Sequence, residues 1–139
     1  MRNHITLITL LSFVMSASTS HAVDNCISTV DMSKLRTAIG EHSEFYGDLP
    51  NRINCLKPIK NQKMVCENEV LRFMERLDHM AGVYAYENAT KTELDHRKPY
   101  GVKGLNKMLN KCDDTECICA NFKEWADASL GGTSPYTSD

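Results

Sequence analysis

All six cysteines of this 139-residue chain lie beyond residue 25, and no other feature constrains the possible fold as strongly. An even number of cysteines in a short chain that begins with an export signal indicates a disulfide framework, here of three bonds. A chain of this size buries a limited core, and a disulfide adds on the order of 2–4 kcal/mol of stability. The six are Cys26, Cys55, Cys66, Cys112, Cys117 and Cys119.

Side-chain geometry narrows the fifteen pairings that six cysteines allow. Cys117 and Cys119 are two residues apart in what we expect to be the first turn of a helix, so their side chains diverge and should bond to different partners. We favour Cys55–Cys66, Cys112–Cys117 and, by elimination, Cys26–Cys119. The other pairings stay open at this point because spacing alone does not decide connectivity.

Residues 1–22 have the layout of a secretory signal peptide. A basic start at Arg2 is followed by an apolar run, Ile5–Met15, which is too short to span a membrane. Ser20-His21-Ala22 places small residues at the two positions that a signal peptidase recognises, so we expect a mature chain that begins near Val23. No later segment is apolar enough to be expected as a membrane anchor. We predict an exported protein, periplasmic or secreted.

The clearest helical pattern runs from about Gln62 to Asn88. Apolar residues recur there at steps of three and four, which predicts one long amphipathic helix. We expect its polar face, including Glu75, Arg76 and Asp78, to be solvated. The segment after Asn88 is compatible with two further turns before Pro99 interrupts them. The apolar stripe holds Val70, Phe73, Met74, Leu77, Met80, Ala81 and Tyr84.

Shorter helices are expected on both sides of the long one. The first contains Leu35 and starts at a cap provided by Asp31 or Ser33. A short helix covers Val102 to Leu109, and the last one starts at a capping box formed by Asp113 and Glu116 and stops at Gly131-Gly132.

No segment alternates with period two, so the predicted fold class is all-α. We expect a small disulfide-stapled bundle of three to four helices around one long helix. This bundle forms a single domain over residues 23–132, and residues 133–139 form a flexible tail.

Several classes of function lack their sequence signatures. No Gly-x-Ser-x-Gly, His-Glu-x-x-His or phosphate-loop motif is present, so we expect neither an enzyme nor a bound cofactor. An alternative interpretation of the Cys117-x-Cys119 pair is a metal site that it forms with Asp113, Asp114 and Glu116. Export argues against such a site, because cysteines outside the cytoplasm are usually oxidised to disulfides. The net charge of −2 and a basic stretch, residues 91–111, with a single aromatic residue argue against nucleic acid and favour a protein partner.

The arrangement of cysteines and helices resembles a known family, the lysozyme-inhibitor-like proteins of the bacterial envelope with the LprI-type cysteine-rich helical domain. The resemblance covers about residues 55–130. It departs from the family where Asn106 and Leu109 replace a tryptophan and an arginine, and where Cys26 and Cys119 are additional. The residues that carry the resemblance are Cys55, Cys66, Leu77-Asp78, Tyr84, Cys112, Cys117, Phe122 and Leu130.

The family resemblance implies a protein that blocks the active-site cleft of a lysozyme or another muramidase. Such a cleft presents two carboxylates, which a protruding basic loop can engage. Our candidate is His96–Gly101, in which Arg97 and Lys98 offer donors and Tyr100 offers a flat surface to the partner. Two other kinds of binding protein remain open: an immunity protein against a delivered toxin, and a secreted effector that binds a host surface protein.

Overall fold

The computed structural model describes residues 25–132 and Tyr136, and the predicted signal peptide, residues 1–22, lies outside them. Over the described residues the chain is mostly helical, contains no strand and is held by three disulfides. The predicted small, disulfide-stapled, all-α fold is therefore confirmed. Its helices are α1 (Cys26–Thr29), α2 (Met32–Tyr46), α3 (Gln62–Glu67), α4 (Glu69–Thr90), α5 (Val102–Leu109) and α6 (Thr115–Leu130).

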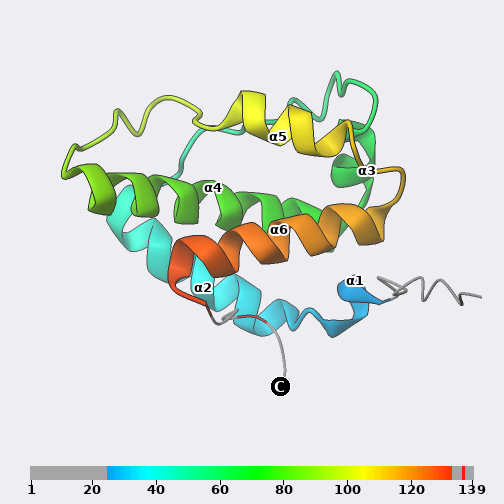
Figure 1. Ribbon diagram of the computed structural model, residues 1–139, viewed down its shortest axis with the longest axis horizontal. Coiled ribbons are helices and arrows are strands. Elements are labelled where there is room, and N and C mark those ends of the chain that lie inside the picture. Colours follow the sequence, from blue (N-terminus) through cyan, green and yellow to red (C-terminus); the bar gives the residue numbers. More distant parts are fainter. Residues whose placement is uncertain (1–24, 133–135, 137–139) are drawn as a thin grey trace, which may run out of the picture.

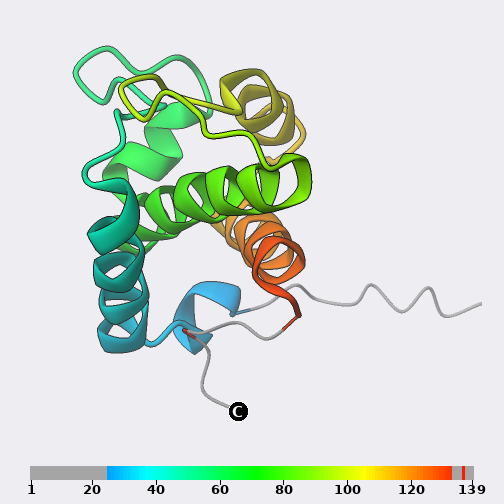
Figure 2. The same ribbon diagram turned by 90° about the vertical axis from the view of Figure 1, so that its left-hand side faces the viewer.

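The long helix α4 lies at the centre of the molecule. Helix α2 packs along one side of it and α6 along another, while α5 lies above it (Figures 1 and 2). Within the predicted apolar stripe of α4, Met74, Leu77, Met80 and Ala81 are buried between these neighbours, and Val70 and Phe73 are partly buried. The prediction is wrong at Tyr84, which is 42% exposed. The core side chains that fill the interfaces include Leu35, Leu71, Met74, Leu77, Leu105, Ile118 and Phe122.

The prediction of one continuous helix over Gln62–Asn88 is wrong at Asn68. This residue adopts an extended conformation (φ −113°, ψ 116°), so α3 ends before it and α4 begins after it. Its side-chain oxygen accepts a hydrogen bond from the N–H of Leu71 at 3.1 Å. Asparagine is a strong N-cap, and the hydrogen bond to a free backbone donor favours a new helix start over continuation.

Helix α4 also ends earlier than the two additional turns that the sequence allowed. Lys91 adopts a left-handed conformation (φ 55°) and its N–H donates to the carbonyl of Glu87, which terminates the helix. The Glu87 carboxylate then accepts hydrogen bonds from the N–H of Leu94 and from His96, both at 2.8 Å. These bonds turn the chain back, and residues 91–101 form a loop.

The caps of α2 and α6 are both aspartates. Asp31 accepts hydrogen bonds from the N–H groups of Ser33 and Lys34, in agreement with one of the two predicted caps. Helix α6 is capped by Asp114, which accepts from the N–H of Cys117, so the predicted capping box at Asp113 is wrong by one residue. Glu116 is free of that role and accepts a hydrogen bond from Ile27 at 3.1 Å, which attaches α1 to α6.

The three disulfides join the same residues that the spacing argument favoured. Cys55–Cys66 closes a loop between residue 55 and α3, Cys112–Cys117 closes the turn before α6, and Cys26–Cys119 ties α1 to the N-terminal half of α6. Cys117 and Cys119 bond to different partners, as expected for side chains that diverge from one helical turn.

The expectation of a flexible tail over residues 133–139 fails at Tyr136. Its side chain is only 1% exposed and belongs to the core, and its carbonyl accepts a hydrogen bond from the N–H of Asp31 at 2.8 Å. Burial of an aromatic side chain contributes about 1.5–3 kcal/mol, which is enough to fix this residue against the start of α2.

The disulfides should differ in their effect on stability because they close loops of very different length. Cys26–Cys119 spans 93 residues and Cys112–Cys117 spans 5. In the chain-entropy model, replacing the first pair with alanines lowers the free energy of unfolding by about 2–3 kcal/mol more than replacing the second. Urea denaturation of the two double variants measures this difference, and equal losses would contradict it.

Candidate functional site

The most unusual feature of the interior is a buried cluster of charges around Arg52. The Arg52 side chain, 5% exposed, donates through Nε to Glu75 Oε1 at 2.6 Å and through Nη2 to Asp78 Oδ2 at 2.7 Å. Nη2 also donates to the backbone carbonyl of Glu75 at 3.0 Å. These bonds fasten the segment around residue 52 to the middle of α4. A buried charge requires such pairing, since desolvation without a partner is very unfavourable.

The prediction that Glu75 and Asp78 belong to a solvated face is wrong, because their side chains are 12% and 5% exposed. A signal for this was present in the helix period. Asp78 lies four residues after Met74 and three before Ala81, within the apolar stripe and not opposite to it. A carboxylate in an apolar stripe indicates a buried partner of opposite charge. Arg52 could not be identified as that partner because it comes from the loop between α2 and α3.

His79 extends the charge cluster toward the loop after α4. It is buried, and its Nε2 accepts a hydrogen bond from the backbone N–H of Tyr100 at 3.0 Å. Because Nε2 is an acceptor, the ring proton is on Nδ1. Burial and the nearby charge of Arg52 lower the pKa of His79 to about 4, so the ring is neutral at neutral pH. Burial also raises the pKa of Asp78, against the opposing effect of Arg52.

The loop that contains the predicted partner-binding residues is held by its own hydrogen bonds. The Tyr100 hydroxyl accepts from the N–H of Asp95 at 3.0 Å and donates to the carbonyl of Asp95 at 3.1 Å. The Asp95 carboxylate bonds to the backbone and the guanidinium of Arg97, which lowers the pKa of Asp95 to about 2. His96 bonds to Glu87 on α4. The loop is thus fixed at several points along its length.

The three predicted partner-binding residues lie in one loop but differ in exposure. The side chains of Arg97 and Lys98 are 90% and 70% exposed. Tyr100 is half-buried against the core, and its hydroxyl is engaged within the loop. Arg97 and Lys98 are therefore exposed to a partner, although each already pairs with Asp95, at 2.8 Å and 3.7 Å. Tyr100 instead packs inward and supports the loop.

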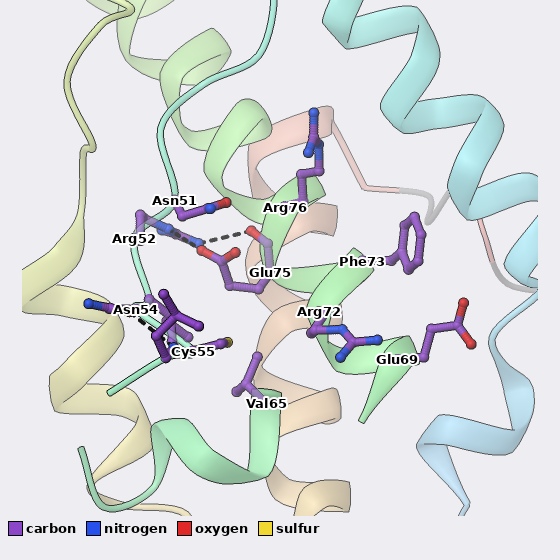
Figure 3. A pocket seen from close by; sticks show the side chains of 12 residues that line it. Asn51, Arg52, Asn54, Cys55, Val65, Glu69, Arg72, Phe73, Glu75 and Arg76 are labelled. Atoms are coloured by element: carbon purple, nitrogen blue, oxygen red, sulfur yellow. Dashed lines mark hydrogen bonds and ion pairs between the residues drawn. The ribbon is translucent and has the colours of Figure 1, made fainter. Parts of the chain in front are cut away.

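Two hollows border on the Arg52 cluster. Figure 3 shows the first, a groove of about 990 Å³ between residues 51–56 and α4. Arg72 donates to the carbonyl of Cys66, and Arg76 bonds to Asp48, so both guanidinium groups are already held by acceptors of the chain itself. Near this groove, Leu56 lies 94% exposed in the loop closed by Cys55–Cys66.

The second hollow is a cavity of about 610 Å³ on the other side of Arg52, which we call the Trp125 cavity. Its walls come from α4, from the first turn of α5, from the end of α6 and from the loop that contains Tyr100. Figure 2 shows these elements grouped on one side of the molecule. The cavity is mostly apolar, and Arg52, Asp78 and His79 lie at its polar end. Periodicity did not indicate this cavity, since Arg52 and the end of α6 are distant in the chain from the continuous stretch of α4, loop and α5 that forms its other walls.

Comparisons with protein-family models, with curated proteins and with solved structures found no match to this chain. The resemblance to lysozyme-inhibitor-like proteins therefore remains a prediction. Within the part of the chain that the structure describes, no helix is long and apolar enough to cross a membrane, and no three metal-ligating side chains form a group.

Arg52 should be far more important for stability than an exposed arginine in an ion pair. Arg52→Ala leaves two buried carboxylates without their counter-charge, and removing one partner of a buried pair lowers stability by about 3–5 kcal/mol. The control is Arg36→Ala, which breaks a pair with Glu69 whose side chains are both 57% exposed and also removes the Arg36 guanidinium from the Phe73 ring, 5.0 Å away. These two exposed contacts together should contribute no more than about 1–2 kcal/mol. Equal losses in urea denaturation would contradict the assignment.

His79 should make stability depend on pH. Its pKa is about 4 in the folded chain and about 6.5 when unfolded, so the unfolded state binds more protons between these values. The contribution of His79 to the free energy of unfolding is therefore complete above pH 6.5 and is lost as the pH falls toward 4. We expect the difference in unfolding free energy between the native chain and His79→Gln to decrease by on the order of 2 kcal/mol over this range. Urea denaturation at several pH values measures it, and a pH-independent difference would contradict it.

Proposed function

We propose that this chain is an exported binding protein that engages a protein partner through loop 95–101 and inhibits a lysozyme by occluding its cleft. Export is supported by the signal-like residues 1–22 and by three disulfides, which are typical of proteins that mature in oxidising compartments. The choice of a lysozyme as the partner rests on the family resemblance.

The observation that carries the proposal is the combination of exposure and rigidity in loop 95–101. Arg97 and Lys98 extend into solvent, while Tyr100 and Asp95 fix the backbone beneath them. A loop that is already ordered loses less conformational entropy on binding than a mobile one. Guanidinium and ammonium groups are suitable partners for the two carboxylates of a muramidase cleft.

The position of the loop is compatible with docking into a cleft. Both ribbon views place it on the side of the molecule away from α1, so it projects from one end of the bundle (Figures 1 and 2). The Tyr100 N–H to His79 bond fastens the base of the loop to α4, which contains the largest number of buried residues among the described helices. The base of the loop is thus attached directly to a helix of the core.

The inhibition can be tested by following the turbidity of a peptidoglycan suspension. Purified, oxidised residues 23–139 at micromolar concentration should protect the suspension from at least one of the c-type, g-type and i-type lysozymes. Absence of protection against all three would contradict lysozyme inhibition and would direct the search to toxin or host partners.

The role of the loop can be tested separately with Arg97→Ala/Lys98→Ala. Loss of two charged contacts should weaken inhibition at least tenfold, roughly 1.4 kcal/mol, with an unchanged melting temperature because both side chains are exposed. The matched control is Lys107→Ala/Lys111→Ala, which removes the same charge from exposed positions at and just after the end of α5. Equal inhibition constants for the two variants would contradict the loop assignment.

A further inference from the structure

The Trp125 cavity has the size and the lining of a small-molecule site. Its volume of about 610 Å³ lies within the range of roughly 300–1,000 Å³ that is typical of ligand pockets. Aromatic side chains contribute to its walls and offer flat surfaces for stacking. The apolar and aromatic lining consists of Val83, Tyr86, Leu94, Tyr100, Trp125 and Ala128.

Two glycines within helices leave the cavity open. Gly82 on α4 and Gly104 on α5 both line it, and a Cβ added at either would meet no atom within 4 Å. Glycine inside a helix lowers stability by roughly 0.5–1 kcal/mol relative to alanine. The chain thus has space for side chains at two cavity positions and leaves that space unfilled.

The polar end of the cavity presents hydrogen-bond donors. Among the described residues, the Nη1 of Arg52 makes no hydrogen bond, although Nε and Nη2 of the same group do. Nη1 is next to the cavity wall, since a Cβ at Gly101 would lie 3.3 Å from it. His79 also lines this end, and its proton is on Nδ1 because Nε2 accepts from Tyr100. A ligand that fits here offers an acceptor.

The charges around Arg52 determine what kind of acceptor fits. The guanidinium is already paired with the carboxylates of Glu75 and Asp78. An anionic ligand would bring a third negative charge to one arginine in a desolvated place, which is unfavourable. A hydroxyl or carbonyl oxygen accepts the same hydrogen bonds without that repulsion.

We propose that the Trp125 cavity binds an uncharged aromatic molecule with one hydrogen-bonding oxygen, with its ring between the aromatic walls and its oxygen toward Arg52 and His79. This proposal does not rest on the proposed lysozyme inhibition, because Arg97 and Lys98 do not line the cavity, although Tyr100 contributes both to its wall and to loop 95–101. The class of ligand is that of aryl alcohols and aryl ketones.

The chain provides its own reporter for this site, since Trp125 is its only tryptophan and therefore gives a single indole N–H signal in a ¹H–¹⁵N spectrum. Three probes of matched skeleton are titrated in the low millimolar range: benzyl alcohol, toluene and benzoate. Benzyl alcohol should shift the indole signal saturably and bind roughly fivefold more tightly than toluene, which lacks the oxygen, and than benzoate, which is charged.

A variant that fills the cavity locates the binding. Gly82→Leu places a side chain in the open space and should weaken binding of benzyl alcohol at least tenfold. The matched control is Gly40→Leu, at a helical glycine of α2 with equally open surroundings that does not line the cavity, and it should bind as the native chain does. Gly104→Leu is a second cavity variant, on α5, and melting temperatures of all three verify folding.

Each result decides a part of the proposal. No saturable shift with any probe would overturn the site, and an undiminished shift in folded Gly82→Leu and Gly104→Leu would overturn its location. Toluene binding as tightly as benzyl alcohol would overturn the role of the polar end, and tighter binding of benzoate would overturn the preference for an uncharged head group. Loss of lysozyme inhibition in Arg97→Ala/Lys98→Ala would leave all of these outcomes unaffected.

Discussion

The buried ion pairs of Arg52 connect parts of the molecule that no helix–helix contact joins. The segment between α2 and α3 is without helical structure, and Arg52 attaches it to the middle of α4 through Glu75 and Asp78. His79, the next residue of α4, in turn holds the loop after that helix at Tyr100. One guanidinium and one adjacent imidazole therefore position both irregular segments on the same helix. Such a cluster is stabilising only while every member keeps its partner.

The elements that follow local rules were predictable from the sequence. The apolar period identified α2, α5, α6 and most of α4. The divergence of Cys117 and Cys119 excluded a bond between them, and the favoured set of pairs is the one found in the structure. The errors also have local causes. Asn68 interrupts an otherwise uniform helical pattern because its side chain caps the next helix, and Asp114 takes the cap that Asp113 was expected to provide.

The candidate sites depend on contacts between residues that are distant in the chain, and sequence periodicity does not reveal such contacts. The pattern identified the exposed basic residues Arg97 and Lys98, since charge in a loop with proline is visible in the sequence. It did not identify Arg52, whose partners lie 23 and 26 residues away on another element. It also gave Tyr100 an outward role, whereas the hydroxyl of that residue bonds back to Asp95. Residues far apart in the chain build the Trp125 cavity, so only the fold reveals it.

The position of the Cys26–Cys119 bond has a mechanical consequence. The bond joins α1 to the N-terminal half of α6, and most of the helical bundle lies between the two cysteines in the chain. A pulling force applied at the two ends of the chain passes through this covalent bond, so the residues between 26 and 119 bear none of it. Only the segments outside the bond can extend until the sulfurs are reduced. Tension in an oxidising medium therefore leaves α2, α4, α5 and the loop with Arg97 in place, and reduction is what exposes them to stretching.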